Sequence, residues 1–218
     1  MAVKAVVDLR PNFGSARLQG ERSTCMAFST SDCHSSARGN LTFLSPEHAH
    51  YHALRRRGFA EMDEGVSMPA MFEVLRMDGQ PEEAEWLYLT ALPVPPSAWR
   101  PPSLRGPVFY REFLEEGSSV DRVNELLDAR MPVVLVMDIS ESFFNPSAEG
   151  IITCDSAEER VNTHAVVAVG SGTDGAERFI LIRNSWGTSW GLDGYAWLNQ
   201  EYLLPRLVSV GIAGQEVP

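Results

Sequence analysis

The order of its predicted elements identifies this chain as an α+β protein in which helices come first and strands later. Helical starts are concentrated before residue 80, and most β-type runs follow residue 131. Between them, residues 93–107 are rich in proline, which suits neither a helix interior nor a central strand. We therefore expect one domain, residues 1–218, with a mainly helical lobe over 11–106, a mainly β lobe over 107–218, and residues 1–10 packed on the β lobe as an extended arm. A functional site is expected in the cleft between the lobes.

Capping residues and periodicity place the individual elements. The predicted helices cover residues 24–39, 45–57, 67–77 and 119–130, and the predicted strands cover residues 132–139, 164–169, 179–183 and 194–198. Ser45, followed by Pro46, is a typical helix start, and so is Ser119. Thr24 and Ser67 are expected to cap the helices that follow them.

Composition excludes several classes of function. Hydrophobic residues make up 44% of the 218 residues and charged residues 22%, which is ordinary for a globular protein. The net charge of −11 argues against nucleic acid or an anionic membrane surface as a partner. No apolar run is long enough to span a membrane, and no signal peptide is recognisable, so a cytoplasmic location is expected. The odd set Cys25, Cys33 and Cys154 does not make a complete disulfide framework, which favours a reducing compartment.

Three segments supply the parts of a cysteine nucleophile. Cys25 opens a predicted helix, His164 lies far downstream at the start of a predicted strand, and Asn184 ends a later strand. A helix N-terminus and a nearby imidazolium both lower a thiol pKa, so we expect Cys25 to be activated and His164 to act as its acid/base partner. The Asn184 amide oxygen is expected to orient the imidazole. Gln19, with the Cys25 backbone N–H, is expected to stabilise an oxyanion.

The sequence around these residues resembles the papain-like cysteine peptidases (clan CA, family C1). The chain reads Gln19-Gly20, then Cys25-Met26-Ala27-Phe28, and later Asn184-Ser185-Trp186-Gly187, continuing through Trp190 to Tyr195. The resemblance implies a helical left lobe, an antiparallel β-barrel-like right lobe and endopeptidase activity on extended peptides. It also implies that Trp186 shields the Asn184–His164 hydrogen bond from water.

The same resemblance suggests which residues bind substrate. Gly65 and Val66 stand where a Gly-Gly pair runs beside the substrate backbone in the family. Met68 is placed on the non-primed wall, with Thr163 and Ala165 on the opposite wall. Together with Trp186 they form the predicted substrate-binding set, and an apolar P2 pocket is expected.

Several positions depart from the family pattern. Met26 replaces the tryptophan that usually follows the cysteine, and Arg22 and Asp63 stand near the positions of the helical lobe's disulfide cysteines. The sequence shows no inhibitory propeptide, and these features together are similar to those of intracellular prokaryotic members.

Two patterns that suggest a cofactor or metal have simpler interpretations. Residues 170–175 fit G-x-G-x-x-G, but a β-type run follows where a dinucleotide site needs a helix, so we expect a hairpin. His48, His50 and His52 suggest a metal, yet only His48 and His52 share a helix face, and a solvated face is expected. No cofactor and no metal are predicted.

The sequence therefore predicts a cysteine endopeptidase that hydrolyses peptides or proteins through a thioester on Cys25. Two alternatives use the same fold. One is a peptide ligase or transpeptidase, in which an amine replaces water as the acyl acceptor. The other is a catalytically inactive peptide-binding module, against which the presence of Gln19, Cys25, His164 and Asn184 together argues. The natural substrate, the means of restraint and the oligomeric state are not predicted.

Overall fold

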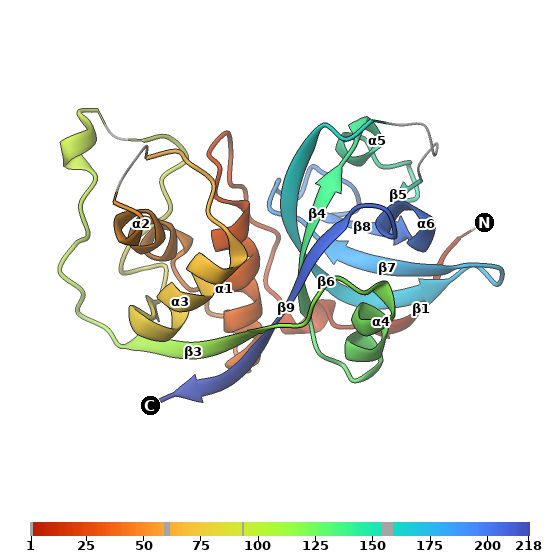
Figure 1. Cartoon of the computed structure of the whole chain (residues 1–218), viewed down its shortest axis with the longest axis horizontal. Helices are drawn as coiled ribbons and strands as arrows, with labels where there is room; N and C mark the ends of the chain where they lie inside the picture. Colours follow the sequence, from red (N-terminus) through yellow and green to blue (C-terminus); the bar gives the residue numbers. More distant parts are fainter. Residues whose placement is uncertain (1, 59–61, 93, 154–158) are drawn as a thin grey trace.

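Two lobes lie side by side in the computed structural model, which describes residues 2–58, 62–92, 94–153 and 159–218 (Figure 1). The helices are α1 (Cys25–Ala37), α2 (Pro46–Arg56), α3 (Met68–Met77), α4 (Val120–Asp128), α5 (Glu141–Phe144) and α6 (Gln200–Leu203), with 3₁₀ turns η1 (Arg10–Asn12) and η2 (Pro96–Ala98). The strands are β1 (Lys4–Asp8), β2 (Gln80–Pro81), β3 (Val108–Glu115), β4 (Val133–Ile139), β5 (Ile151–Ile152), β6 (Asn162–Thr173), β7 (Arg178–Arg183), β8 (Tyr195–Asn199) and β9 (Leu207–Val217). Helices α1 to α3 form one lobe, and most strands form the other, so the predicted α+β class is confirmed.

The strands form a single sheet in the order β2-β3-β9-β4-β6-β7-β8-β5, with β1 paired to β6. The ladders are antiparallel, as expected for the β lobe, and the short β5–β8 pair is parallel. The N-terminal arm joins the β lobe as β1, whose Lys4 lies opposite Thr173 of β6.

Sequence analysis missed β3 and β9, which link the two lobes. In Figure 1, β3 runs below α1 and α3, and β9 crosses from the β lobe to pair with it. Gln80 of β2 lies opposite Phe109 of β3, so the helical lobe adds its own short strand to the sheet. Burial does not alternate regularly along these strands: the first three residues of β3 are all half-buried, and Val210, Gly211 and Ile212 of β9 are buried in succession. A period-two pattern of apolar and polar residues is therefore weak in both.

The predicted caps are correct at two helices and wrong at two. Ser45 accepts a hydrogen bond from the His48 backbone N–H, and Ser119 accepts one from Arg122. Thr24 and Ser67 precede α1 and α3, but neither side chain caps its helix. The Thr24 hydroxyl instead forms a 2.8 Å hydrogen bond with the Tyr88 hydroxyl, so it tethers the start of α1 to a distant loop.

The G-x-G-x-x-G segment is a β hairpin, as predicted, with Thr173 of β6 opposite Arg178 of β7. Two of its glycines allow β1 to approach β6 closely. A Cβ at Gly170 would overlap the Val7 carbonyl oxygen, and a Cβ at Gly172 would lie 2.9 Å from the Lys4 carbonyl oxygen. The close packing of β1 against β6 therefore explains these two glycines of the G-x-G-x-x-G pattern.

The prediction of a solvated histidine face on α2 is wrong. His48 and His50 are buried, at 4% and 1% exposure, and only His52 is half-buried. The His48 and His52 rings lie 4.3 Å apart. Within the described ranges, no group of three potential metal ligands is found. The helices of the described part are also too short or too polar to cross a bilayer.

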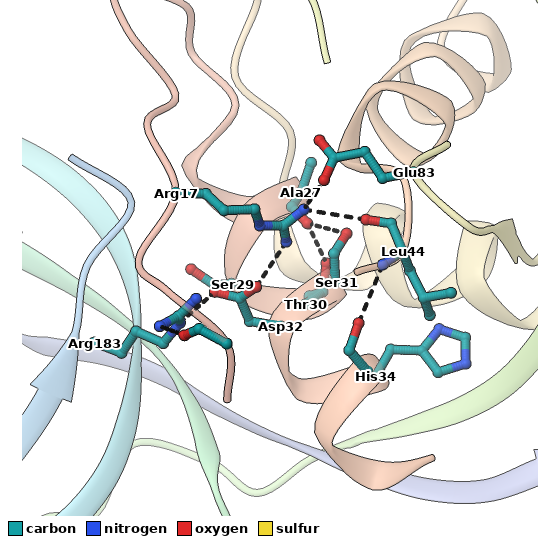
Figure 2. Close-up of polar contacts among 12 residues, drawn as sticks. Arg17, Ala27, Ser29, Thr30, Ser31, Asp32, His34, Leu44, Glu83 and Arg183 are labelled. Atoms are coloured by element: carbon teal, nitrogen blue, oxygen red, sulfur yellow. Dashed lines mark hydrogen bonds and ion pairs between the residues drawn. The ribbon is translucent and has the colours of Figure 1, made fainter. Parts of the chain in front are cut away.

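A buried carboxylate joins the lobes. Asp32 on α1 is 2.6 Å from Arg17 Nη2 and 2.7 Å from Arg183 Nε at the end of β7 (Figure 2). Burial raises the pKa of Asp32, but the two guanidinium groups outweigh it and hold the pKa below its usual value. Arg183 also donates to the Gly14 and Ser15 carbonyl oxygens, so its other nitrogens are satisfied.

Replacing Asp32 with asparagine is expected to lower the free energy of unfolding by about 3–5 kcal/mol, because buried Arg183 loses its counter-charge and Arg17 keeps only its ion pair with Glu83. Urea unfolding at pH 7 measures the change. The matched control is Asp128→Asn, which breaks a partly exposed ion pair with Arg178 and is expected to cost under about 1 kcal/mol. Equal losses in the two variants would contradict the role given to Asp32.

Acid is expected to destabilise the helical lobe through its buried histidines. Burial lowers the pKa of His34 and His48 to about 4 and that of His50 to about 3, from an ordinary 6.5. The stability linked to these neutral rings is complete above pH 6.5 and is lost as pH falls toward 4, because the unfolded chain binds protons that the native chain does not. Each ring contributes about 3 kcal/mol to the loss.

The measurement is the free energy of unfolding at intervals between pH 7 and pH 4.5. The His50→Phe variant is expected to show a shallower slope, by about one proton, because one buried imidazole is gone. A slope unchanged by that substitution would show that His50 does not contribute.

Candidate active site

The cleft between the lobes holds the predicted nucleophile. It has a volume of about 470 Å³, and Cys25 lies at its floor, at the first residue of α1, partly exposed. Both lobes line it: Gln19, Glu21, Arg22, Ser23, Cys25, Met26, Gly65 and Val66 on the helical side, and Val136, Ile139, Phe144, Asn162, Thr163, His164, Ala165 and Trp186 on the β side. The structure thus brings Cys25 and His164 into one cavity from segments far apart in the chain.

His164 and Asn184 form a buried hydrogen bond. His164 is in β6 and Asn184 directly follows β7, and these strands are antiparallel neighbours, so both residues lie at the same end of the sheet. His164 Nε2 lies 2.8 Å from Asn184 Oδ1, which also accepts the Ser185 backbone N–H at 2.8 Å. A backbone N–H can only donate, so Oδ1 is the acceptor and His164 Nε2 carries the proton. His164 Nδ1 is then the nitrogen able to accept a proton from a thiol.

Aromatic rings cover this hydrogen bond. The Trp186 ring lies 4.8 Å from that of His164, and the Phe144 ring stacks on the outer face of Trp186 at 5.2 Å. His164 and Asn184 are 6% and 2% exposed. Water therefore has little access to the pair, as the resemblance implies for Trp186.

The titration of Cys25 differs from the prediction. Burial raises the pKa of its thiol, and hydrogen bonds from the backbone N–H groups of Ala165, Met26 and Cys25 lower it by less. Burial also lowers the pKa of His164 to about 4, against the opposing hydrogen bond to Asn184. The expected low thiol pKa is therefore wrong for an isolated thiolate. Ionisation is favourable here only when the thiol proton passes to His164, because the thiolate and the imidazolium then offset each other's desolvation.

Gln19 lies in the cleft wall with a fixed amide. Its Nε2 donates to the Arg22 carbonyl oxygen at 2.8 Å, and its Oε1 accepts the Ser185 hydroxyl at 2.6 Å. Because the Arg22 carbonyl can only accept, Nε2 must face it. One amide hydrogen then remains available toward the cleft.

Five of the six predicted substrate-binding residues line the cleft, namely Gly65, Val66, Thr163, Ala165 and Trp186. Met68 is the exception. It is 3% exposed, packs in the core and lies 3.5 Å from the Ser209 hydroxyl through its sulfur. Its predicted place on the cleft wall is therefore wrong, because α3 turns this side chain toward the sheet.

Sequence analysis missed several residues that line the cleft. Phe144 lies on α5, a four-residue helix too short for periodicity to reveal. Val136 and Ile139 were predicted in a strand but not at the site. Of the other two thiols, Cys33 is fully buried and does not line the cleft, and Cys154 lies outside the described residues.

Comparisons with known proteins find a matching family over part of the chain. Residues 109–214 match the family described as papain family cysteine protease. Cysteine proteinase 3 of Dictyostelium discoideum is 38% identical over 86 residues, and a cathepsin L-like proteinase of Fasciola hepatica is 39% identical over 82 residues. These matches cover 39% and 38% of this chain, and only 25% and 24% of the length of the two relatives.

Solved structures extend the likeness to the whole chain. Xylellain, a cysteine protease from Xylella fastidiosa, superposes with a TM-score of 0.76 over 98% of this chain and 87% of its own, at 22% identity. The Carica candamarcensis cysteine protease CMS1MS2, solved with E-64, gives 0.71 over 96% and 97%, at 21% identity. The class of protein follows: the chain has the papain-like fold, and the predicted resemblance to family C1 is confirmed.

Because the pKa of the Cys25 thiol is raised, the role of His164 as proton acceptor can be tested without measuring turnover. In His164→Gln, the Cys25 thiol has no group to take its proton, so its alkylation by iodoacetamide at pH 7 is expected to fall about tenfold or more. Its pH midpoint is expected above the ordinary thiol value of 9.0. Mass spectrometry of native protein gives the rates, and buried Cys33, whose pKa is raised well above that value, is an internal control. Unchanged alkylation at pH 7 would show that His164 does not accept the proton.

Proposed function

We propose that this chain is a cysteine endopeptidase that cleaves peptide or protein substrates through an acyl-enzyme on Cys25. The observation that carries the proposal is the 2.8 Å hydrogen bond between His164 Nε2 and Asn184 Oδ1, beside a cleft that also exposes Cys25. That bond leaves His164 Nδ1 free to exchange a proton with the thiol. The relatives and solved structures named above are proteases, which supports this function over a ligase or a binding module.

The chemistry follows from the groups present. Cys25 Sγ forms a bond to the substrate carbonyl carbon while its proton passes to His164 Nδ1. The carbonyl oxygen becomes an oxyanion, for which the free Gln19 N–H and the Cys25 backbone N–H are the candidate donors. The C–N bond then breaks, and the amine leaves with the proton from His164. Water, deprotonated by His164, attacks the thioester and releases the acid.

Gly65 and Val66 are proposed to run beside the substrate backbone. Gly65 already uses its carbonyl oxygen, which accepts Arg57 Nη1 at 2.9 Å, so Val66 is the better candidate for pairing with an extended peptide. Val136, Ile139 and Ala165 give the opposite wall an apolar character. The two lobes are proposed to act as one peptidase domain, because residues of both form the cleft.

We also propose a cytoplasmic, reducing and near-neutral setting. Cys33 is buried and unpaired, as is usual where disulfides do not form. The neutral buried histidines of the helical lobe support a working pH above about 6, because their protonation opposes folding.

Labelling by an epoxide inhibitor tests the nucleophile. One adduct is expected on the native protein at pH 7 and none on Cys25→Ala, as measured by intact mass. Hydrolysis of a peptide library, with and without a competing amine, then distinguishes hydrolysis from transfer by product mass. Absence of both an adduct and cleavage would favour the binding module.

Asn184→Ala is expected to reduce kcat/KM about 100-fold, because an unoriented imidazole transfers protons less often in the correct geometry. Cys25→Ala is expected to abolish turnover. Steady-state kinetics on one peptide compare the variants, with circular dichroism to confirm folding. Total loss in a folded Asn184→Ala protein would contradict an orienting role.

A further inference from the structure

The loop of residues 19–24, which carries Gln19 and leads into Cys25, is attached to the helical lobe through Arg22. The Arg22 side chain is only 3% exposed. Its Nη1 lies 2.7 Å from Glu47 Oε2 and 2.6 Å from the Leu89 carbonyl oxygen. Glu47 lies on α2 and is fully buried. The Arg22–Glu47 ion pair is therefore buried in the helical lobe, at the edge of the cleft.

Both charged groups have further close neighbours. Glu47 Oε1 accepts the Trp99 indole N–H at 2.7 Å, and Oε2 accepts the Leu89 backbone N–H at 3.0 Å. The Arg22 guanidinium carbon lies 5.2 Å from the Tyr88 ring centre and 5.6 Å from that of Trp99. We call Arg22, Glu47, Tyr88 and Trp99 the Arg22 anchor.

The Arg22 anchor is connected directly to Gln19. The Arg22 carbonyl oxygen accepts Gln19 Nε2–H at 2.8 Å and thereby sets which way the amide faces. The Tyr88 hydroxyl donates to the Gln19 carbonyl oxygen at 2.6 Å, so it fixes the backbone of the same residue. Displacing residue 22 would therefore move or rotate the amide that is proposed to meet the oxyanion.

A purely stabilising role explains the Arg22 anchor poorly. A buried ion pair is often no more stabilising than packed apolar side chains of similar size. Arg22 Nε and Nη2 are buried and have no hydrogen-bond partner among the described residues, which adds a further cost. Holding a backbone carbonyl in one place, however, requires a directional contact, and the pair with Glu47 provides one.

We propose that Arg22 is a positioning residue for the Gln19 amide, and that its ion pair with Glu47 fixes the loop of residues 19–24 to the helical lobe, as a covalent bond would. The neighbouring Ser23 donates its backbone N–H to Asp63 at 3.0 Å, so two adjacent residues of the loop are bound to carboxylates of other segments. The non-covalent link needs no oxidation. The proposal rests on the proposed function, because it concerns the stabilisation of an oxyanion.

A double-mutant cycle between Arg22→Met and Gln19→Ala tests this, with kcat and KM for one peptide substrate as the readout. Arg22→Met alone is expected to lower kcat about 10- to 100-fold with little change in KM, because the amide is misplaced only for the transition state. In the Gln19→Ala background, the same substitution is expected to have almost no effect. Arg178→Met, which breaks a distant surface pair, is the control and leaves kcat unchanged.

A second readout separates positioning from general damage. Alkylation of Cys25 by iodoacetamide involves no oxyanion, so its rate at pH 7 is expected to stay within about twofold in Arg22→Met. Binding of a peptide aldehyde, whose adduct presents an oxyanion, is expected to weaken in parallel with kcat. If Arg22→Met does not fold, Trp99→Phe removes one hydrogen bond to Glu47 and is expected to show the same pattern with a smaller loss.

Three results overturn the proposal. One is an equal loss of kcat in both backgrounds, which would assign Arg22 a general structural role. Another is a parallel fall in Cys25 alkylation. The last is a folded Arg22→Met protein, or Trp99→Phe in its place, with wild-type kcat, while the wild-type chain turns over normally. A wild-type chain that forms no acyl-enzyme and cleaves no peptide refutes the proposed function, and this proposal with it.

Discussion

The placement of Asp32 is the constraint on which the site depends most. Its carboxylate lies between Arg17 and Arg183, and Arg183 immediately precedes Asn184 in the chain. Asp32 is on α1, the helix that begins at Cys25. A single buried group therefore fixes the distance between the element that carries the thiol and the element that orients the imidazole. A buried charge with two charged partners has few alternative arrangements, since any displacement leaves an ion unpaired in a medium of low polarity.

Beside this fixed arrangement of α1 and β7, the cleft holds two titratable groups, Cys25 and His164. Burial opposes ionisation of Cys25 and of His164 separately, because it raises the pKa of the thiol and lowers that of the imidazole. Charge is favourable only when both form together, next to backbone donors and a covered His164–Asn184 bond.

Sequence reasoning located most of the elements and the segments that carry the candidate site residues, because these rest on local signals. Ser45 and Ser119 cap their helices, and the Asn-Ser-Trp-Gly run is contiguous. Where it failed, a distant contact decided the outcome. Thr24 bonds to Tyr88 and not to its own helix, and His48 and His50 are buried beneath rings from another loop. Met68 packs in the hydrophobic core, with its sulfur 3.5 Å from the Ser209 hydroxyl of β9. These contacts join residues that are far apart in the chain, so no local sequence pattern predicts them.

The pairing of early and late segments affects how the chain folds during synthesis. Lys4 lies opposite Thr173, and Asp32 bonds to a residue 151 positions later. The first strand and the helix that begins with Cys25 therefore leave the ribosome long before their partners exist. Until β6 and β7 are made, β1 has an unpaired edge and Asp32 lacks one of its two cations. A nascent chain of this kind lacks the complete candidate site throughout most of its translation, and the cleft residues come together only when the last third has been added.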